Sequence, residues 1–488
     1  MHIHFPSTEL GQDFCACTVA KQKAADKFQP PQARRLSTSM KLSRSPLRSC
    51  LAIVLGFLAS QIVSVNASNT ADLHTAVAED YAEHLGALFV HFHENPELSF
   101  QETETARRLA KELRSVGFEV TEGVGGTGIV ALLENGPGPL VMMRADMDGL
   151  PVEEKSGLPY ASKAKQIDPS GNEVFVMHAC GHDVHITSLV GTARQMSARR
   201  AEWGGTLMLI GQPAEERIAG ARAMMEDDLW ERFGKPDMAM AFHVSSGVPT
   251  GKLGAAVGAQ FSGADTVDII VHGVGAHGAS PHTGVDPVVL GSQIVLALQT
   301  LVSREMAPRD AGVVTVGAFH AGTKHNIISD RAHLQLTVRN DDPSNRELLL
   351  EGIQRIAENM GRAAGLPDDK LPEVIVSNES VPVTFNDTEL TQKLRALWQT
   401  ELGSDVMWDK KRRGMGSEDF PFFTNDPYIP STYFLVGGTA PAAFAAAASG
   451  GAAIPSHHSP IFKIEPEPSV TLGVEATVLG LLELMGHE

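Results

Sequence analysis

The feature that most constrains the fold of this chain is a series of short apolar runs separated by segments of helical periodicity. The runs have the length and composition of buried strands, and they lie at 128–133, 140–145, 206–211 and 237–243. Segments with apolar residues at helical spacing lie before or between them, at about 74–92, 102–116, 183–198 and 219–227. Buried strands that alternate with helices predict an α/β fold with a largely parallel sheet.

A second pattern interrupts the first, between residues 264 and 377. Its expected elements follow the order strand, helix, strand, strand, helix, strand. Asp286 and Pro287 are typical of a helix start, and the capping box Ser344-x-x-Glu347 predicts the start of the second helix. The order βαββαβ is that of a ferredoxin-like domain.

We therefore predict a two-domain α/β protein. The larger α/β domain, expected to be the catalytic one, consists of 68–258 and 378–488. A ferredoxin-like domain at 259–377 interrupts it. Residues 442–453, rich in alanine and glycine, predict a surface loop.

The N-terminal segment predicts export. Residues 51–65 form a mostly apolar run, shorter than the ~20 residues that span a membrane. Basic residues precede it, and Val65-Asn66-Ala67 is a small-residue cleavage site. This is the pattern of a signal peptide whose natural start is Met40, with 1–67 as leader and signal and cleavage near Ala67. We expect a periplasmic or secreted protein without a stable membrane anchor; the alternative is an uncleaved anchor helix.

Charge and cysteine content exclude other classes. The formal net charge is −18 and no long basic run is present, so we expect no nucleic-acid partner. The four cysteines are too few for a disulfide scaffold, and three of them lie within 1–67. Cys180 is the one that remains, and a lone cysteine in an exported protein is either inert or chemically employed.

The densest cluster of reactive side chains surrounds that cysteine. In the string MHACGHDVH, Cys180 and His182 can reach one metal ion if the chain turns at Gly181. Thiolate and imidazole are ligands that suit zinc and its neighbours. His178 and His185 are weaker candidates, because either can be a packed or supporting histidine.

Other candidates follow the expected strands, where ligands of α/β sheets gather. Glu215 and Glu216 come after the run 206–211, and adjacent carboxylates point in different directions, so one can bind metal while the other serves as a base. Taken singly, each cluster has an ordinary structural explanation. Taken together, they predict a two-metal hydrolase with the ligands Cys180, His182, Glu216, His243 and His458.

Eight strings in order resemble the M20 metallopeptidase superfamily: RADMDGLP, MHACGHD, QPAEE, AFHV, GVGAHGASPH, HNIISD, GSEDF and HHSP. The similarity is to its aminoacylase-like amidohydrolase branch, which includes hippurate hydrolases and indole-acetyl-amino-acid hydrolases, and it covers about 80–485. The resemblance implies a di-metal catalytic domain interrupted by a ferredoxin-like lid that usually forms a homodimer.

The resemblance also implies a role for each matching residue. Cys180 is expected to bridge the two metals. We choose His458 over His457 because the family's ligand stands immediately before Ser/Thr-Pro. His182, Glu216 and His243 are expected to bind metal, and Glu215 is the expected general base. Asp148, and more weakly Asp146, is expected to orient a ligand. In the inserted domain, His277 is expected to stabilise the oxyanion in the neighbouring subunit, and Asn326 and Arg339 to bind the substrate carboxylate. Ser329 departs from the proline common in the family, which affects the loop near Asn326 rather than the chemistry.

The expected activity is hydrolysis of the amide bond of small N-acyl amino acids by a metal-activated water and a glutamate base. Two divalent ions per subunit are implied, with zinc or manganese favoured and cobalt or nickel also compatible. One alternative is a metallo-carboxypeptidase or dipeptidase of the same superfamily. Another is a non-catalytic exported protein that binds metals or conjugates, although such a binder needs no base at Glu215.

Overall fold

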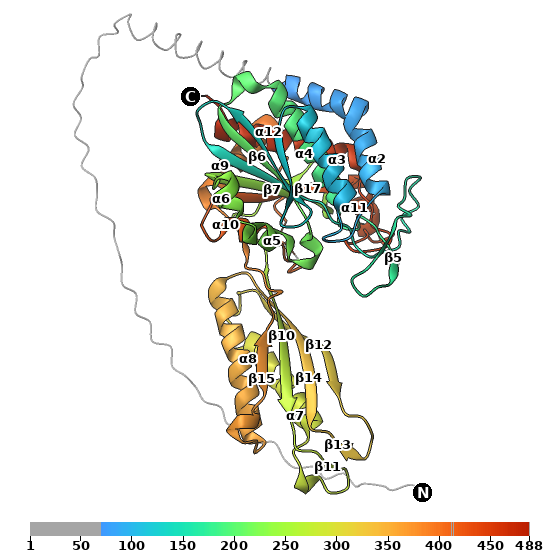
Figure 1. Cartoon of the computed structure of the whole chain (residues 1–488), viewed down its shortest axis with the longest axis vertical. Helices are drawn as coiled ribbons and strands as arrows, with labels where there is room; N and C mark the ends of the chain where they lie inside the picture. The colour runs from blue at the N-terminus through green and yellow to red at the C-terminus, as the bar shows by residue number, and fades with distance from the viewer. Residues whose placement is uncertain (1–69, 411, 413, 488) are drawn as a thin grey trace, which may run out of the picture. The chain divides into compact units, whose positions relative to one another are not determined.

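The structure, a computed structural model, describes residues 70–410, 412 and 414–487, so the predicted leader and signal peptide lie outside the described residues. Its larger sheet has seven strands in the order β1-β2-β6-β3-β7-β17-β8 (Figure 1). The strands are β1 (Glu119–Val124), β2 (Gly128–Asn135), β3 (Leu140–Asp146), β6 (Gly205–Gln212), β7 (Met238–Pro249), β8 (Leu253–Gly254) and β17 (Ser431–Thr439).

The α/β fold class predicted from the sequence is confirmed, but the sheet is mixed rather than largely parallel. Its four central strands, β6, β3, β7 and β17, are parallel to one another. β1, β2 and β8 join at the edges in antiparallel orientation. Only residues 125–127 separate β1 from β2, and so short a connection can join only antiparallel strands. Gly125 and Gly126 make this turn with positive φ angles of 62° and 109°.

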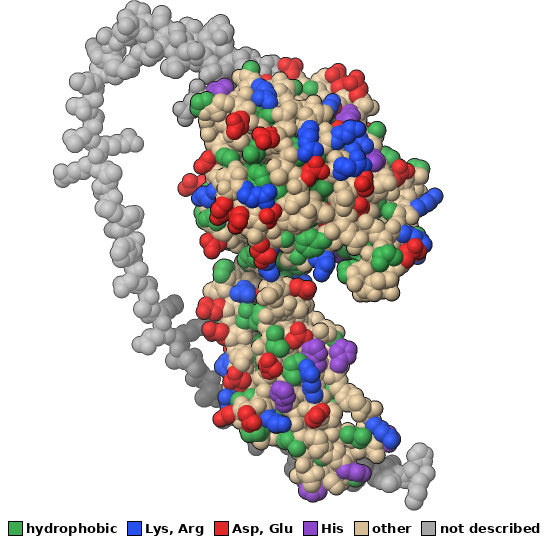
Figure 2. Space-filling view, in the orientation of Figure 1, with side chains coloured by type: hydrophobic (Ala, Val, Ile, Leu, Met, Phe, Trp, Pro, Cys, Tyr) green, Lys and Arg blue, Asp and Glu red, His purple; other side chains and the backbone are tan. Residues whose placement is uncertain are grey.

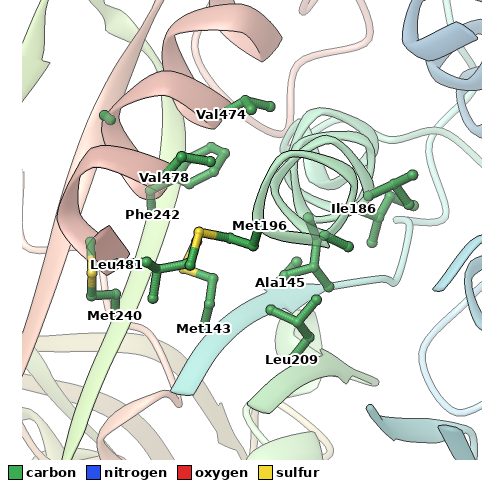
Figure 3. Close-up of a cluster of buried hydrophobic side chains, with 14 of the residues drawn as sticks. Met143, Ala145, Ile186, Met196, Leu209, Met240, Phe242, Val474, Val478 and Leu481 are labelled. Carbon is green, nitrogen blue, oxygen red and sulfur yellow. The ribbon is translucent and has the colours of Figure 1, made fainter. Parts of the chain in front are cut away.

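Helices cover both faces of this sheet. One face carries α2 (Gly86–Glu94), α3 (Thr103–Ser115), α4 (His182–Ala198), α9 (Thr388–Glu401) and α12 (Pro466–Met485), and helical backbone at 70–80 and η1 (Tyr81–Leu85) leads into α2. The other face carries α5 (Gly220–Glu226), α6 (Leu229–Phe233) and α10 (Pro421–Thr424). Figure 3 shows Met143 and Phe242 of the sheet beside Met196 of α4 and Val478 of α12. Because neighbouring strand residues alternate between two apolar layers, the central strands read as nearly continuous apolar runs.

The inserted segment forms a second sheet with its own core. Its main elements are β10 (Gly263–His272), α7 (Pro287–Thr300), η5 (Leu301–Glu305), β12 (Gly312–Ala321), β14 (Arg331–Asn340), α8 (Pro343–Ala363) and β15 (Glu373–Val376). The strands are antiparallel in the order β12-β14-β10-β15, which is the ferredoxin-like arrangement. Leu334 of β14, Ile294 of α7 and Ile353 of α8 are fully buried in its core.

Shorter strands complete the described chain in three pairs. They are β4 (Lys165–Ile167) with β5 (Glu173–Phe175), β9 (Gly258–Phe261) with β16 (Thr384–Asn386), and β11 (Ala276–His277) with β13 (Ile327–Ile328). β9 and β16 flank the inserted segment in the sequence and pair with each other.

Two local predictions need correction, and one is confirmed. Asp286 caps α7, accepting a hydrogen bond from the Val288 amide at 2.8 Å, as predicted. α8, however, is capped by Asp342 and not by Ser344, because Pro343 is favoured at the first helical position and the Asp342 carboxylate accepts from the Ser344 amide at 2.8 Å. The expected loop at 442–453 contains the helix α11 (Pro441–Ala448), since alanine has the highest helix propensity even where no residue is buried.

Candidate metal centre and active site

The predicted ligands meet at the carboxyl ends of the central parallel strands. Asp146 is the last residue of β3, and Glu215 and Glu216 follow β6 in a short 3-10 turn, η3 (Glu215–Arg217). His243 lies within the neighbouring strand β7, and His182 is the first residue of α4. The topology thus brings together residues far apart in the sequence, at the sheet edge where α/β proteins bind ligands.

Hydrogen bonds fix the ring orientation of two histidines. Nδ1 of His182 lies 2.8 Å from the main-chain oxygen of Asp148, and Nδ1 of His243 lies 2.6 Å from that of Val244. A carbonyl oxygen only accepts, so each Nδ1 carries the ring proton and donates it. In the neutral form of each ring, Nε2 therefore carries the lone pair that can bind a metal ion.

These nitrogens converge on Cys180 and Glu216. Cys180 Sγ lies 3.4 Å from His243 Nε2, and His458 Nε2 lies 3.3 Å from Glu216 Oε2. His182 Nε2 and Glu216 Oε1 are 3.9 Å apart, and both atoms are buried without a hydrogen-bond partner among the described residues. These two buried atoms can each bind a cation, and a metal ion between them would supply the partner that both lack.

Among the described residues, five groups of possible ligands have their ligand atoms within 4.8 Å of one another, and two overlapping groups together contain all five predicted ligands. One group is Cys180, His182 and His243, and the other is Cys180, Glu216 and His458. Cys180 belongs to both, as a thiolate shared by two cations would. Sulfur, imidazole nitrogen and carboxylate oxygen are the ligand atoms that divalent transition metals prefer, so the residues fit two such ions.

The neighbouring histidines are engaged elsewhere. Nε2 of His457 accepts a hydrogen bond from the Ser246 amide at 3.2 Å, which leaves the ring proton on Nδ1, 3.7 Å from Cys180 Sγ. His185 accepts from the Val244 amide and donates to Asp146. Neither ring keeps a free nitrogen for metal. His178 is buried without a hydrogen-bond partner among the described residues, but it joins none of the candidate ligand groups.

The site carries more negative charge than its own side chains neutralise. Burial, together with the charges of Glu418 and Glu216, raises the pKa of Glu215 well above its usual range. Burial also raises the pKa of Glu216 to about 8. Burial and the Glu216 and Glu215 charges raise the pKa of the Cys180 thiol. Divalent cations held among these groups would reverse each of these shifts and favour thiolate and carboxylate.

Asp148 connects the base and the ligands. Its carboxylate accepts hydrogen bonds from the amides of Glu215 at 3.1 Å and Glu216 at 3.0 Å, and from the Ser99 hydroxyl at 2.7 Å. Its main-chain oxygen accepts from His182. Asp148 therefore orients the expected base and two expected ligands at once.

Two supporting residues escaped the sequence analysis. Ser99 holds Asp148, and the fully buried Glu102 accepts a hydrogen bond from the Ala214 amide at 2.8 Å. Ala214 has a φ of +48°, so the turn before Glu215 is held in a conformation unusual for alanine. The string PELSFQE contains both residues, but nothing in its pattern shows that they act on a turn more than a hundred positions away.

A buried ionic network lies behind Asp146. The completely buried Arg144 donates to Asp146 at 2.8 Å, to Glu418 at 2.7 Å and to Gln212 at 2.7 Å. Burial opposes ionisation of Asp146, but the Arg144 charge, together with the charge of His182 and the hydrogen bond from His185, outweighs burial and holds the pKa of Asp146 well below its usual range. Glu418, which belongs to the string GSEDF, contacts Arg144 and also lines the cleft described next.

A cleft of about 1600 Å³ opens on the ligand groups. Cys180, Glu215, Glu216, His243 and His458 line it, together with Arg339 from β14. The guanidinium of Arg339 donates to the Ser417 hydroxyl at 2.6 Å and forms no ion pair with a carboxylate of the described chain. A half-buried cation without a counter-ion is suited to bind an anionic group of a substrate.

His277 and Asn326 lie together in a different place. His277 pairs with Ile327 between β11 and β13, and the Gly278 amide donates to the main-chain oxygen of Asn326 at 2.9 Å. Both side chains are exposed, and neither is among the described residues that line the cleft. The structure thus does not bring these two residues to the metal-ligand groups of their own chain.

Comparison with known proteins agrees with this geometry. The family description "Peptidase family M20/M25/M40" matches residues 142–449. Hippurate hydrolase of Campylobacter jejuni is 37% identical over 68% of this chain and 82% of its own length, and thermostable carboxypeptidase 2 of Saccharolobus solfataricus is 35% identical over 71% and 83%. The YxeP protein of Bacillus subtilis, described as a dinuclear metal binding peptidase of the M20 family, has a TM-score of 0.67 at 27% identity, covering 85% of this chain and 99% of that one.

Fold and site together define a metal-dependent amidohydrolase that acts on carbon–nitrogen bonds. The ligand groups and the dinuclear structural relative support two divalent cations. The chain belongs to the M20 peptidase family, in its aminoacylase-like amidohydrolase branch.

Proposed function

We propose that this protein hydrolyses the amide bond of N-acyl amino acids. The observation that carries the proposal is the shared cleft, which is lined by Glu215, by the guanidinium of Arg339 and by four of the five expected ligands, namely Cys180, Glu216, His243 and His458. A free carboxylate on the substrate is what Arg339 would select. The similarity to hippurate hydrolase supports the same activity.

Five residues would hold the two cations: Cys180, His182, Glu216, His243 and His458. When bound, the cations supply Lewis-acid activation of water and of the scissile carbonyl. The two ions are expected to be zinc or manganese, and cobalt or nickel also suits sulfur and nitrogen ligands.

The remaining steps fall to the chain's own residues. Glu215 Oε2 lies 3.8 Å from His182 Nε2 and faces the same cleft, so it is placed to take the proton of the attacking water and to deliver it to the leaving amine. Asp148 holds the Glu215 backbone during both transfers. Arg339 binds the carboxylate of the amino acid product. Asn326 lies outside this cleft, so its expected contact with the carboxylate would have to be made in the cleft of a second subunit.

His277 would act in the active site of a second subunit. It is exposed beside β13, and the catalytic cleft of its own chain lacks it. We propose a homodimer through the inserted domain, in which His277 steadies the developing oxyanion of the partner. Sedimentation of the purified protein should give twice the chain mass, and a strictly monomeric, fully active enzyme would exclude this role.

Export is part of the proposal as well. The apolar run and the cleavage site near Ala67 support a periplasmic or secreted enzyme. The N-terminal sequence of the protein recovered from its producing cell should begin near residue 68.

The base assignment is tested by Glu215→Gln. Glutamine keeps the size and polarity of the side chain but cannot accept a proton, so kcat should fall by about 10²–10⁴-fold while the metal content stays at the wild-type level. Glu216→Gln is the matched control, since removing a metal ligand should lower both. A Glu215→Gln enzyme with near-normal kcat would refute the assignment.

A metallo-carboxypeptidase is the second candidate, favoured by the 35% identity to a thermostable carboxypeptidase. Both reactions leave an amino acid with a free carboxylate, so Arg339 fits either. They differ in the group before the scissile bond, which is a blocked acyl group in one case and a peptide in the other. Comparison of kcat/KM for hippurate and for unblocked dipeptides separates the two.

A further inference from the structure

The cleft has a distinctly apolar part that the metal groups and Arg339 do not use. Trp408 and Phe444 line it, with ring centroids 6.2 Å apart. Phe444 is presented by α11, a helix in which no residue is buried, so this aromatic side chain is held at the cleft without serving a hydrophobic core. Both rings are half-buried and belong to no hydrophobic core cluster of the described residues, and an aromatic pair of this kind in a cleft is typical of a binding surface.

This apolar part is continuous with the metal centre. Leu435 of β17 is the register partner of the expected ligand His243 across two parallel strands, and it lines the cleft. On the other side, the ring of Phe261 lies 6.3 Å from that of His243. A substrate whose scissile carbonyl is at the metal centre therefore has apolar side chains directly beside that carbonyl.

The cations near the aromatic pair are already compensated. Arg395 donates to Asp409 at 2.7 Å, and Arg412 is paired with Asp341. The ammonium of Lys410 lies 4.2 Å from the centre of the Trp408 ring, in a cation–π contact that fixes the indole. Arg339 is thus the cleft guanidinium that no carboxylate of the described residues neutralises.

These features assign opposite ends of the substrate. We infer that the acyl group binds at an aromatic subsite made by Trp408, Phe444, Leu435 and Phe261, and that the enzyme selects aromatic acyl groups over acetyl. The inference rests on the proposed function. Arg339 binds the carboxylate of the amino acid. The apolar side chains of the subsite therefore remain for the acyl group, on the other side of the amide bond. The cleft volume of about 1600 Å³ leaves room for a ring there, whereas an acetyl group would leave the subsite uncovered.

The test varies the acyl group on a constant amino acid. With purified full-length protein and added divalent metal, kcat/KM for benzoylglycine should exceed that for N-acetylglycine by at least about tenfold. Trp408→Ala and Phe444→Ala should each lower this ratio severalfold or more, because kcat/KM should fall much further for benzoylglycine than for N-acetylglycine. Trp408→Phe should keep most of the selectivity. Tyr428→Ala is the matched control, because Tyr428 is an exposed aromatic residue outside the cleft lining.

Two further substrates separate this inference from its neighbours. Cyclohexanecarbonylglycine matches benzoylglycine in size, so equal kcat/KM for both would overturn the aromatic preference. N-acetylphenylalanine places the ring on the amino acid instead. If Trp408→Ala changed its kcat/KM as much as that of benzoylglycine, the subsite would belong to the amino-acid side chain and the assignment would be wrong.

A binding measurement keeps the two proposals distinguishable. Trp203, Trp230 and Trp398 are buried, so a change in tryptophan fluorescence when benzoylglycine is added to Glu215→Gln should report on Trp408 and disappear in the double variant with Trp408→Phe. If benzoylglycine binds in this way but the wild type does not hydrolyse it, the proposed function is wrong and the subsite assignment stands. If the wild type hydrolyses N-acetylglycine faster than benzoylglycine, or if benzoylglycine causes no fluorescence change, only the subsite assignment is wrong.

Discussion

Asp148 shows how much of this site depends on a side chain that touches no substrate. Three donors, the amides of Glu215 and Glu216 and the hydroxyl of Ser99, share its carboxylate. Because the two amides belong to the expected base and an expected ligand, displacement of Asp148 should disturb proton transfer and metal binding together.

Asp148→Ala should therefore lower metal affinity and kcat, each by about 10–100-fold. Ser99→Ala is the graded control, since it removes one of three donors and leaves the carboxylate in place, and its effect should be clearly smaller. Metal content after dialysis and steady-state kinetics measure the two quantities. Equal effects of both variants would show that Asp148 does not act through Glu215 and Glu216.

At this scale the sequence predicts the residues that stand in short strings beside strand ends. Cys180, His182 and Glu216 are recognisable because the metal chemistry requires those residue types. His458 could be chosen over His457 only by resemblance, whereas the structure gives a physical reason, namely that both nitrogens of His457 are engaged. Ser99 and Glu102 could not be predicted because Ser99 acts through the Asp148 carboxylate and Glu102 binds the Ala214 amide of a distant turn.

At the scale of elements, the start of α4 is tightly constrained. Gly181 has a φ of +90°, and a Cβ there would lie 2.4 Å from Cγ1 of Val244. The left-handed turn places Cys180 and His182 on either side of it, so that both side chains reach the centre.

Gly181→Ala should combine backbone strain of about 1–2 kcal/mol with overpacking of about 1–3 kcal/mol, and it should also lower metal content. Gly365→Ala is the matched control, since Gly365 has a φ of +83° but nothing within 4 Å of an added Cβ, so only the strain applies. Chemical denaturation gives both free energies of unfolding. A Gly181→Ala protein as stable as the control would contradict the close approach.

The predicted runs at 128–133, 140–145, 206–211 and 237–243 correspond to β2, β3, β6 and β7, whereas β1 and β17 were not predicted, and the strand directions were predicted less well. Apolar runs reveal burial on both faces, but β1 and β2 show that a short turn decides whether neighbours are antiparallel. The position of the α8 cap depended on Pro343, and α11 forms because alanine favours helix where composition alone indicates a loop.

At the scale of the whole molecule, a buried charge cluster joins α2 to α4. His93 lies 2.7 Å from Asp183 and 3.2 Å from Glu154. Burial opposes protonation of His93, but the hydrogen bonds that its ring donates to these two carboxylates, together with their negative charges, outweigh burial and raise the pKa of His93 to about 10.

Because the folded-state pKa lies above the ordinary value of about 6.5, the stabilisation by protonated His93 is fully present below pH ~6.5 and is lost as the pH rises through about 10. His93→Gln should therefore be less stable than the wild type near pH 6.5, and the difference should shrink towards pH 10. Urea midpoints at several pH values measure it, with the exposed His282→Gln as control. A difference that is constant or grows with pH would contradict the charge assignment.

The account depends most on two cations held by five side chains. Elemental analysis of the purified, metal-loaded protein tests it directly, with Cys180→Ser measured in parallel because Cys180 belongs to both ligand groups. We predict two divalent ions per chain in the wild type and a clear loss in the variant. Fewer than two ions in the wild type, or an undiminished count in Cys180→Ser, would contradict the dinuclear centre.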